Sequence, residues 1–317
     1  MTDRPDLQGF LEDTLALLDP IMPADSLDGA SDEALEGLLA QCQRQVTRIQ
    51  ATARQPLRLI HHFACTGGTL MSRALASQPN TMLLSEVDPF STNRRISPGF
   101  APSDLIHLAR QNRTPPGQDT ITEMFLQQLD VLHRATQGEG RHLVIRDHTH
   151  SHFCEFADPG DRPLMRDIVS GRFETRALLT VRHPLDSYAS LRHNGWARGL
   201  TDTLEGYARC YLRFLDAYRG LEIFHYERFA QHPDLECRRM TECLALEFEP
   251  RWQDFLPAIH LTGDSGRKSA SIVQRPRRPL TEALRSQFEA AMPDCYRELC
   301  DRLGYDPDPA GSVLPMT

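Results

Sequence analysis

The sequence predicts an α/β fold in three layers, with a mostly parallel five-stranded sheet between helices on both faces. Short apolar runs of strand length alternate along the chain with longer segments of helical periodicity. The strand-like runs are apolar throughout, as parallel strands buried on both faces are. The 317 residues are enough for one large domain of this class.

The predicted elements follow one another in regular alternation. The strands are apolar runs of ordinary strand length and cover residues 57–63, 81–86, 142–148, 176–182 and 221–226. The helices have apolar residues three and four positions apart and cover residues 70–75, 120–135, 164–169, 184–196, 201–218, 235–246 and 281–303. Prolines predict that residues 99–117 are partly loop.

The chain divides into a helical lead-in, residues 1–55, and an α/β domain, residues 56–317. Apolar residues in the lead-in recur at helical spacing, Pro20 and Pro23 interrupt them, and Ser31 is a suitable N-cap for the second segment. We favour packing of the lead-in on the domain surface. A homodimer contact or a substrate lid is the alternative.

Composition restricts the classes of function. A net charge of −8 argues against general nucleic-acid binding, so any anion site must be local. The eight cysteines include no C-x-x-C pair, which argues against zinc ribbons and dithiol redox motifs, and we expect no metal. The N-terminus lacks a signal-peptide pattern and no apolar run reaches membrane-spanning length, so we expect a cytoplasmic protein without a membrane partner.

The segment after the first predicted strand has the composition of an anion-binding loop. Thr66–Thr69 reads Thr-Gly-Gly-Thr, which is small and flexible enough for backbone N–H groups to surround one anion. A helix follows at Leu70, and its N-terminal end favours negative charge. The Gly-Lys-Ser/Thr of nucleotide-cleaving phosphate loops and the Gly-x-Gly-x-x-Gly of dinucleotide folds are both absent. An ordinary strand-to-helix turn is the alternative.

Polar residues follow every predicted strand at the point where it ends. The carboxyl ends of parallel strands share one edge of the sheet, where ligands bind. Five clusters on one edge therefore favour the anion-binding interpretation over the ordinary turn. They are residues 65–68, 85–88, 146–150, 182–184 and 225–228.

Three segments resemble the sulfotransferases that use 3′-phosphoadenosine 5′-phosphosulfate (PAPS). Residues 65–70 resemble the family's 5′-phosphosulfate loop, commonly basic-Ser-Gly-Thr/Ser-Thr-Leu/Trp. Residues 181–190 resemble its 3′-phosphate motif, in which an Arg ends a strand and a Ser follows eight residues later. Residues 224–233 resemble its Tyr-Glu-Asp-Leu stretch, with Tyr226 as the tyrosine. The resemblance extends from residue 57 to the C-terminus and leaves out the lead-in.

The resemblance implies a P-loop-like nucleotide-binding fold and a sulfuryl transfer from PAPS to a hydroxyl or amine of a small-molecule acceptor, by in-line displacement and without a metal. Adenosine 3′,5′-bisphosphate is the product. An arginine fork suits a terminal phosphate, and a serine near a helix N-terminus adds a hydroxyl. A surface ion pair between Arg182 and Asp186 is the alternative. The residues implied to bind PAPS are Cys65, Thr66, Gly67, Gly68, Thr69, Leu70, Arg182, Ser190 and Tyr226.

Cys65 departs from the family pattern, which has Lys or Arg at this position. That cation stabilises charge on the bridging oxygen of the leaving phosphate. Another cation replaces it, or the activity is weaker or different. A late basic loop closes over PAPS in the family, and a solvated basic turn is the alternative here. The candidates are Arg267, Lys268 (the one lysine of the chain), Arg275, Arg277 and Arg278.

Glu86 is the first candidate for the catalytic base. It stands at the end of the second predicted strand, twenty-one residues after Cys65, which resembles the Glu base of the tyrosylprotein sulfotransferase branch. His148 is the second candidate, because cytosolic branches place a His after the third strand, and Asp147 and His150 are candidates to orient it. A helix or loop cap is the alternative for Glu86.

Three further interpretations concern His61, His62 and the function as a whole. Both histidines lie inside the first predicted strand, which favours core or sheet contacts. A nucleotide phosphotransferase is one alternative function, and it predicts Mg²⁺ dependence and the missing Gly-Lys-Ser/Thr loop. A non-catalytic or divergent nucleotide-binding protein is the other, with Cys65 marking lost chemistry.

Overall fold

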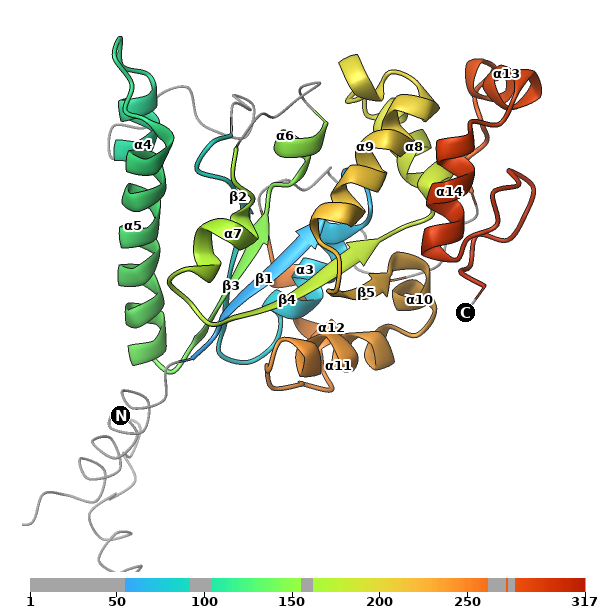
Figure 1. Cartoon of the computed structure of the whole chain (residues 1–317). Coiled ribbons are helices and arrows are strands. Elements are labelled where there is room, and N and C mark those ends of the chain that lie inside the picture. The colour runs from blue at the N-terminus through green and yellow to red at the C-terminus, as the bar shows by residue number, and fades with distance from the viewer. Residues whose placement is uncertain (1–54, 92–103, 155–161, 262–271, 273–276, 317) are drawn as a thin grey trace, which may run out of the picture. The chain divides into compact units, whose positions relative to one another are not determined.

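The computed structural model of the chain describes residues 55–91, 104–154, 162–261, 272 and 277–316. The predicted lead-in, residues 1–55, therefore lies outside the described residues apart from its last position. Within the described ranges, the chain forms a five-stranded sheet with helices on both faces, as the sequence predicts (Figure 1).

All five strands are parallel, and the sheet has the order β2-β3-β1-β4-β5. Every residue of the central strand, β1, is buried. It pairs with a strand on each side, and Ile60 lies opposite Arg146 of β3 and Leu178 of β4. The carboxyl ends of the strands therefore lie along one edge of the sheet. The strands are β1 (Leu57–His62), β2 (Thr81–Val87), β3 (His142–Asp147), β4 (Thr175–Val181) and β5 (Glu222–His225).

One face of the sheet is covered by the helix that follows β1 and by the helices that follow β5. Four strands each contribute an apolar side chain to this face. These side chains pack against Met71 and other apolar side chains of the helices, and they are Ile60, Val144, Leu178 and Phe224. The helices are α3 (Gly68–Ala76), α10 (Tyr226–Gln231), α11 (Pro233–Cys243) and α12 (Trp252–Phe255), followed by the 3₁₀ turn η3 (Leu256–Ala258).

The opposite face carries two adjacent groups of helices. Leu59 and Ile145 pack with α5 (Gln118–Gly138) and α7 (Met165–Ser170), while Leu179 and Val181 pack with the helices around α9 (Leu204–Ala217). The remaining helices are α4 (Leu105–Arg110), α6 (His150–Phe153), α8 (Pro184–His193), η2 (Gly199–Thr201), α13 (Glu282–Ala290) and α14 (Asp294–Leu303). No helix within the described ranges has both the length and the apolar character that crossing a membrane requires.

Two predicted elements differ from the structure for local reasons. The predicted helix over residues 281–303 is two helices, α13 and α14, because Pro293 cannot continue a helix and instead caps α14. Tyr226 does not end β5, as predicted, but begins α10. This boundary turns the tyrosine ring toward the loop between β1 and α3, where the candidate site lies.

Candidate active site

The loop between β1 and α3 has the backbone that an anion site needs. Cys65 and Gly67 both have left-handed backbone angles, with φ of 62° and 82°. The hydroxyl of Thr66 donates to the carbonyl of Phe63 at 2.8 Å, so this side chain stabilises the turn. In the described part of the chain, no acceptor contacts the backbone N–H of Gly67 or Gly68. Two donors at the start of a helix are therefore available to a ligand.

Both glycines of this loop are required by close neighbours. A Cβ on Gly67 would lie 2.2 Å from Cδ2 of Tyr226, and one on Gly68 would lie 2.7 Å from Cγ of His62. Gly67 also has the positive φ that favours glycine. The loop is thus held between two rings. We describe the candidate site as two halves, one around Tyr226 and Arg182 and the other around His62 and Glu86.

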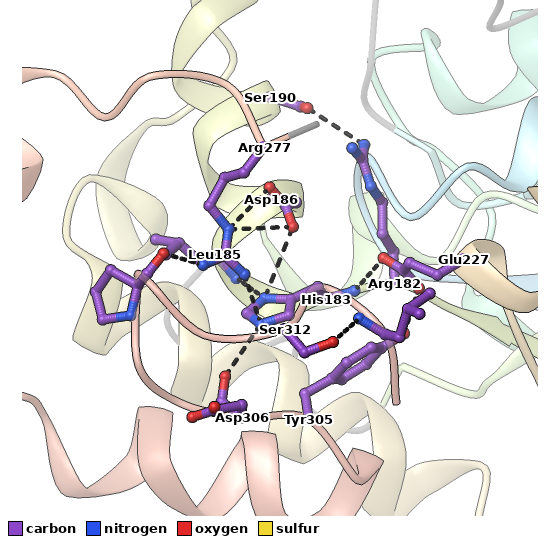
Figure 2. A network of polar contacts seen from close by, with 12 residues as sticks. Arg182, His183, Leu185, Asp186, Ser190, Glu227, Arg277, Tyr305, Asp306 and Ser312 are labelled. Carbon is purple, nitrogen blue, oxygen red and sulfur yellow. Dashed lines mark hydrogen bonds and ion pairs between the residues drawn. The ribbon is translucent and has the colours of Figure 1, made fainter. Parts of the chain in front are cut away.

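The half that contains Tyr226 also contains the guanidinium of Arg182. Cζ of Arg182 lies 4.8 Å from the centroid of the Tyr226 ring, and Nη1 of Arg182 donates to Oγ of Ser190 at 3.4 Å. Among the described residues, nothing hydrogen-bonds the buried Nε of this arginine. Figure 2 shows the guanidinium beside Ser190. An arginine held in this way, with one donor unsatisfied, is suited to a phosphate or sulfate.

The alternative in which Arg182 pairs with Asp186 is wrong. Asp186 lies in the first turn of α8 and pairs with Nε of Arg277, 3.3 Å from Oδ1 (Figure 2). Arg277 also donates to the carbonyls of Asp308 and Pro309. One of the basic candidates from the late loop is therefore used to tie the C-terminal segment to α8.

A buried carboxylate supports this half of the site. Glu227 accepts a hydrogen bond from the backbone N–H of His183 at 3.0 Å and another from the hydroxyl of Tyr305. Burial raises the pKa of Glu227, and these hydrogen bonds lower it. Glu227 thereby fixes the end of β4, which carries Arg182, to the chain that follows α14.

The other half of the site is built around Glu86. This residue lies where the pairing of β2 with β3 is irregular, between Leu84 and Val87, and its φ is 60°. Its side chain is only 2% exposed, and Oε1 lies 2.8 Å from Nη2 of Arg146. Burial raises the pKa of Glu86, while Arg146 lowers it and Asp147 raises it further. A left-handed, buried glutamate is unusual and indicates a functional position.

Arg146 holds this half together, and the sequence alone did not assign it a role. Its three nitrogens reach different partners: Nη2 reaches Glu86, Nη1 donates to Oγ of Ser85 at 2.8 Å, and Nε donates to Nε2 of His62 at 3.0 Å. Burial, then Arg146, lowers the pKa of His62 well below its usual value, so the imidazole is neutral and accepts. The sequence did contain a signal for this role, because Arg146 is a charged residue inside a predicted apolar strand.

The second base candidate, His148, lies against the first. Its Nε2 is 3.4 Å from Oε2 of Glu86 and 2.6 Å from Nε2 of His150, and Nδ1 is 3.3 Å from Oγ of Ser91. Burial, then Arg146 and Arg162, lowers the pKa of His148 to about 3. The structure thus brings both predicted base candidates and His150 into one cluster.

The expectation that Asp147 orients His148 is wrong. Oδ2 of Asp147 accepts from the hydroxyl of Tyr218 at 2.7 Å and lies 2.9 Å from Nδ1 of His61. The rings of His61 and Tyr218 stack with centroids 4.1 Å apart. Successive strand residues point to opposite faces, so Asp147 faces away from Arg146 and its neighbours. His61 is the core histidine that the sequence predicts.

The two halves meet at the loop. The Tyr226 ring lies next to Gly67, and the guanidinium of Arg182 lies over that ring. The His62 ring lies next to Gly68 and accepts a hydrogen bond from Arg146. Arg146 also forms an ion pair with Glu86. One site therefore contains available N–H groups, a guanidinium and an acid–base cluster. Three of the predicted basic residues, Arg267, Lys268 and Arg275, lie outside the described residues.

The chain has no match among protein-family models or curated proteins. It is similar to solved sulfotransferases. The sulfotransferase domain from the curacin biosynthetic pathway is 16% identical with a TM-score of 0.45, over 80% of this chain and 99% of that domain. The Alicyclobacillus acidocaldarius sulfotransferase is 14% identical with a TM-score of 0.41, over 80% and 98%. Mouse sulfotransferase SULT7A1, solved in complex with PAP, is 12% identical with a TM-score of 0.40, over 78% and 89%.

Proposed function

We propose that this chain is a PAPS-dependent sulfotransferase that transfers a sulfuryl group to a hydroxyl or amine of a small-molecule acceptor. The position of Tyr226 carries the proposal. Its ring touches Gly67 of the loop and lies under the guanidinium of Arg182. Two anion-binding elements of different chemistry thus lie on either side of one ring, which suits a nucleotide with negative groups at both its 5′ and 3′ positions.

The residues present fit such a donor. The N–H groups of Gly67 and Gly68 would hold the 5′-phosphosulfate, with Thr66, Thr69 and Leu70 shaping the helix start. Arg182 and Ser190 would hold the 3′-phosphate. A buried donor without a partner costs about 1–3 kcal/mol, and an anion at Nε of Arg182 would remove that cost. PAPS supplies an activated sulfuryl group, and the bisphosphate leaves with the electrons of the broken S–O bond.

Glu86 is the proposed general base. Arg146 fixes Oε1, so Oε2 is the oxygen that takes the acceptor's proton. Burial raises the pKa of Glu86, which makes the carboxylate a better proton acceptor than an exposed glutamate. His148, the alternative base, lies 3.4 Å from that oxygen, and its Nε2 also contacts His150.

Cys65 supplies no cation to the leaving phosphate. Its Sγ lies 4.0 Å from Nδ2 of Asn194, a neutral donor. We infer that Arg267 or Lys268 supplies the missing charge, or that transfer is slower than in family members with a basic residue here.

Two measurements test the proposal. Calorimetric titration should find that adenosine 3′,5′-bisphosphate binds much more tightly than ATP, without added Mg²⁺. Equal or tighter binding of Mg²⁺–ATP would favour a phosphotransferase instead. Incubation with PAPS and mixtures of hydroxyl and amine acceptors should then yield a sulfated product by mass spectrometry. Tight bisphosphate binding without product from any acceptor would indicate a non-catalytic nucleotide-binding protein.

A further inference from the structure

Three potential metal ligands converge at the edge of the sheet next to the loop. Glu86 comes from β2, His148 follows β3, and His150 begins α6. One ligand atom from each lies within 4.8 Å of the other two. The Nε2 atoms of the two histidines are 2.6 Å apart, and Oε2 of Glu86 is 3.4 Å from that of His148. Glu86 and two histidines that follow it by 62 and 64 positions thus place three ligand atoms around one point.

This cluster is not satisfied by its own hydrogen bonds. Within the described residues, the buried Oε2 of Glu86 and Nδ1 of His150 have no hydrogen-bond partner. One of the two facing nitrogens donates its proton to the other, so this pair has no proton left for Oε2 of Glu86. A buried carboxylate oxygen, 2% exposed as part of its side chain, therefore points at lone pairs. A cation at this point would satisfy Oε2 of Glu86 and the facing Nε2 atoms of the two histidines.

We propose that Glu86, His148 and His150 bind one divalent transition-metal ion of the zinc type. Two imidazole nitrogens and one carboxylate oxygen are a donor set that zinc accepts in catalytic sites, where it keeps a further position open for water or substrate. Mg²⁺ and Ca²⁺ prefer sets made of oxygen alone.

Neighbouring groups orient these ligands. Oγ of Ser91 lies 3.3 Å from Nδ1 of His148, and Arg146 holds the other oxygen of Glu86 at 2.8 Å. Hydrogen bonds of this kind fix the tautomer and direction of metal ligands. Arg146 also repels a cation, so the affinity is expected to be lower than that of a site without a neighbouring guanidinium.

In the metal-loaded protein Oε2 of Glu86 is a ligand, so the metal takes over from this carboxylate the activation of the acceptor hydroxyl. A hydroxyl bound at the open position has a lowered pKa and loses its proton more readily. This role depends on the proposed sulfuryl transfer, whereas the binding of the metal does not.

Metal titration of the full chain tests the proposal. Protein dialysed against EDTA is titrated with Co²⁺, whose visible bands report the donor atoms, and Zn²⁺ is added as competitor. We expect one Co²⁺ per chain, d–d bands without strong thiolate charge-transfer bands, and displacement by Zn²⁺. His150→Ala and the isosteric Glu86→Gln should each weaken Co²⁺ binding at least tenfold. His152→Ala is the matched control, because its ring packs on Phe153 and lies outside the cluster, and it should leave binding unchanged.

Other outcomes would overturn the metal site. They are the absence of saturable Co²⁺ binding, thiolate bands from the cysteines, or binding that neither variant weakens while thermal unfolding shows both to be folded. If metal-free protein transfers sulfate as fast as the loaded protein, the metal has no part in transfer and the proposed function stands. If the metal binds as expected but adenosine 3′,5′-bisphosphate does not, the proposed function fails and the metal site stands.

Discussion

At the scale of single residues, Arg182 is expected to contribute most to nucleotide affinity. Its guanidinium is stacked on Tyr226 and contacts Ser190, and its Nε has no partner in the described part of the chain. Arg182→Ala should weaken adenosine 3′,5′-bisphosphate binding by about 2 kcal/mol, roughly 30-fold, measured by calorimetry. Arg192→Ala is the control, because Arg192 lies exposed on α8, the helix that carries Ser190, and donates to the carbonyl of Asp202. Equal affinities in the two variants would remove Arg182 from the site.

Glu86→Gln should abolish sulfuryl transfer and leave bisphosphate binding intact, because the amide cannot take a proton. The native rate should fall as the pH is lowered through the pKa of Glu86, which burial places above the usual 4.5. The sign follows from the base acting in its deprotonated form, which is lost at low pH. Rates measured from pH 5 to 8 test this. Full turnover by the variant would shift the role of base to His148.

The sequence predicts which residues lie at the sheet edge, but it predicts less well which side chains they contact. Glu86 and His148 were chosen as base candidates from their positions at strand ends and from the family resemblance, and parallel strands do bring these ends to one edge. Arg146 and Asp147 are adjacent, but strand alternation sends Arg146 to the site and Asp147 to the other face. The alternation of side chains along a strand is readable in the sequence, and it already separates Arg146 from Asp147. The contact of Tyr226 with Gly67 depends on long-range packing, which no local pattern encodes.

At the scale of elements, the loop between β1 and α3 depends on Gly67. A Cβ there would overlap Tyr226 at 2.2 Å, and the φ of 82° is unfavourable for alanine. Gly67→Ala should therefore displace the ring that carries Arg182 and weaken bisphosphate binding at least tenfold.

A matched glycine separates the clash from the backbone effect. Gly195 has a φ of 67°, and a Cβ added to it would have no atom within 4 Å. Gly195→Ala should cost about 1–2 kcal/mol of stability from backbone strain and leave nucleotide binding unchanged. Thermal unfolding and calorimetry on both variants make the comparison. If both variants bind the bisphosphate like the native chain, the Tyr226 contact is not needed.

Element boundaries show where sequence patterns end. The five strands were predictable because each is a short, mainly apolar run, and the parallel arrangement followed from the alternation with helices. The break between α13 and α14 was also encoded, since Pro293 stands inside the predicted helix. The start of α10 at Tyr226 was not, because residues 221–226 have strand-like composition and the helix begins within it.

At the scale of the whole molecule, buried histidines should make stability depend on pH. Burial, then Arg277, lowers the pKa of His183 to about 3. As the pH falls below 6.5, the unfolded chain binds a proton that the folded chain does not, so stability decreases from pH 6.5 toward pH 3. Between pH 7 and 5, this one residue should cost about 2 kcal/mol.

A single substitution isolates this contribution. His183→Asn keeps a side-chain acceptor for the N–H of Leu185 and removes the titration. Urea unfolding at pH 7 and pH 5 should find that the variant loses about 2 kcal/mol less than the native chain. An identical loss in both would show that His183 is protonated in the folded protein at pH 5.

The order of the strands in the sheet could not be predicted from local sequence patterns. The parallel sheet and its polar edge followed from local patterns, but the order β2-β3-β1-β4-β5 depends on pairings between distant segments. The same holds for the contact between the last residues of the chain and α8.

That contact has a practical consequence for work on the protein. Arg277 grips the carbonyls of Asp308 and Pro309 and the carboxylate of Asp186, one turn before Ser190, and His183 lies 3.1 Å from the carbonyl of Asp306. An affinity tag fused to the carboxyl terminus, or trimming of the last dozen residues, is therefore expected to disturb Arg182 and Ser190, the proposed 3′-phosphate site. Conversely, a bound nucleotide should slow digestion of the tail by carboxypeptidase.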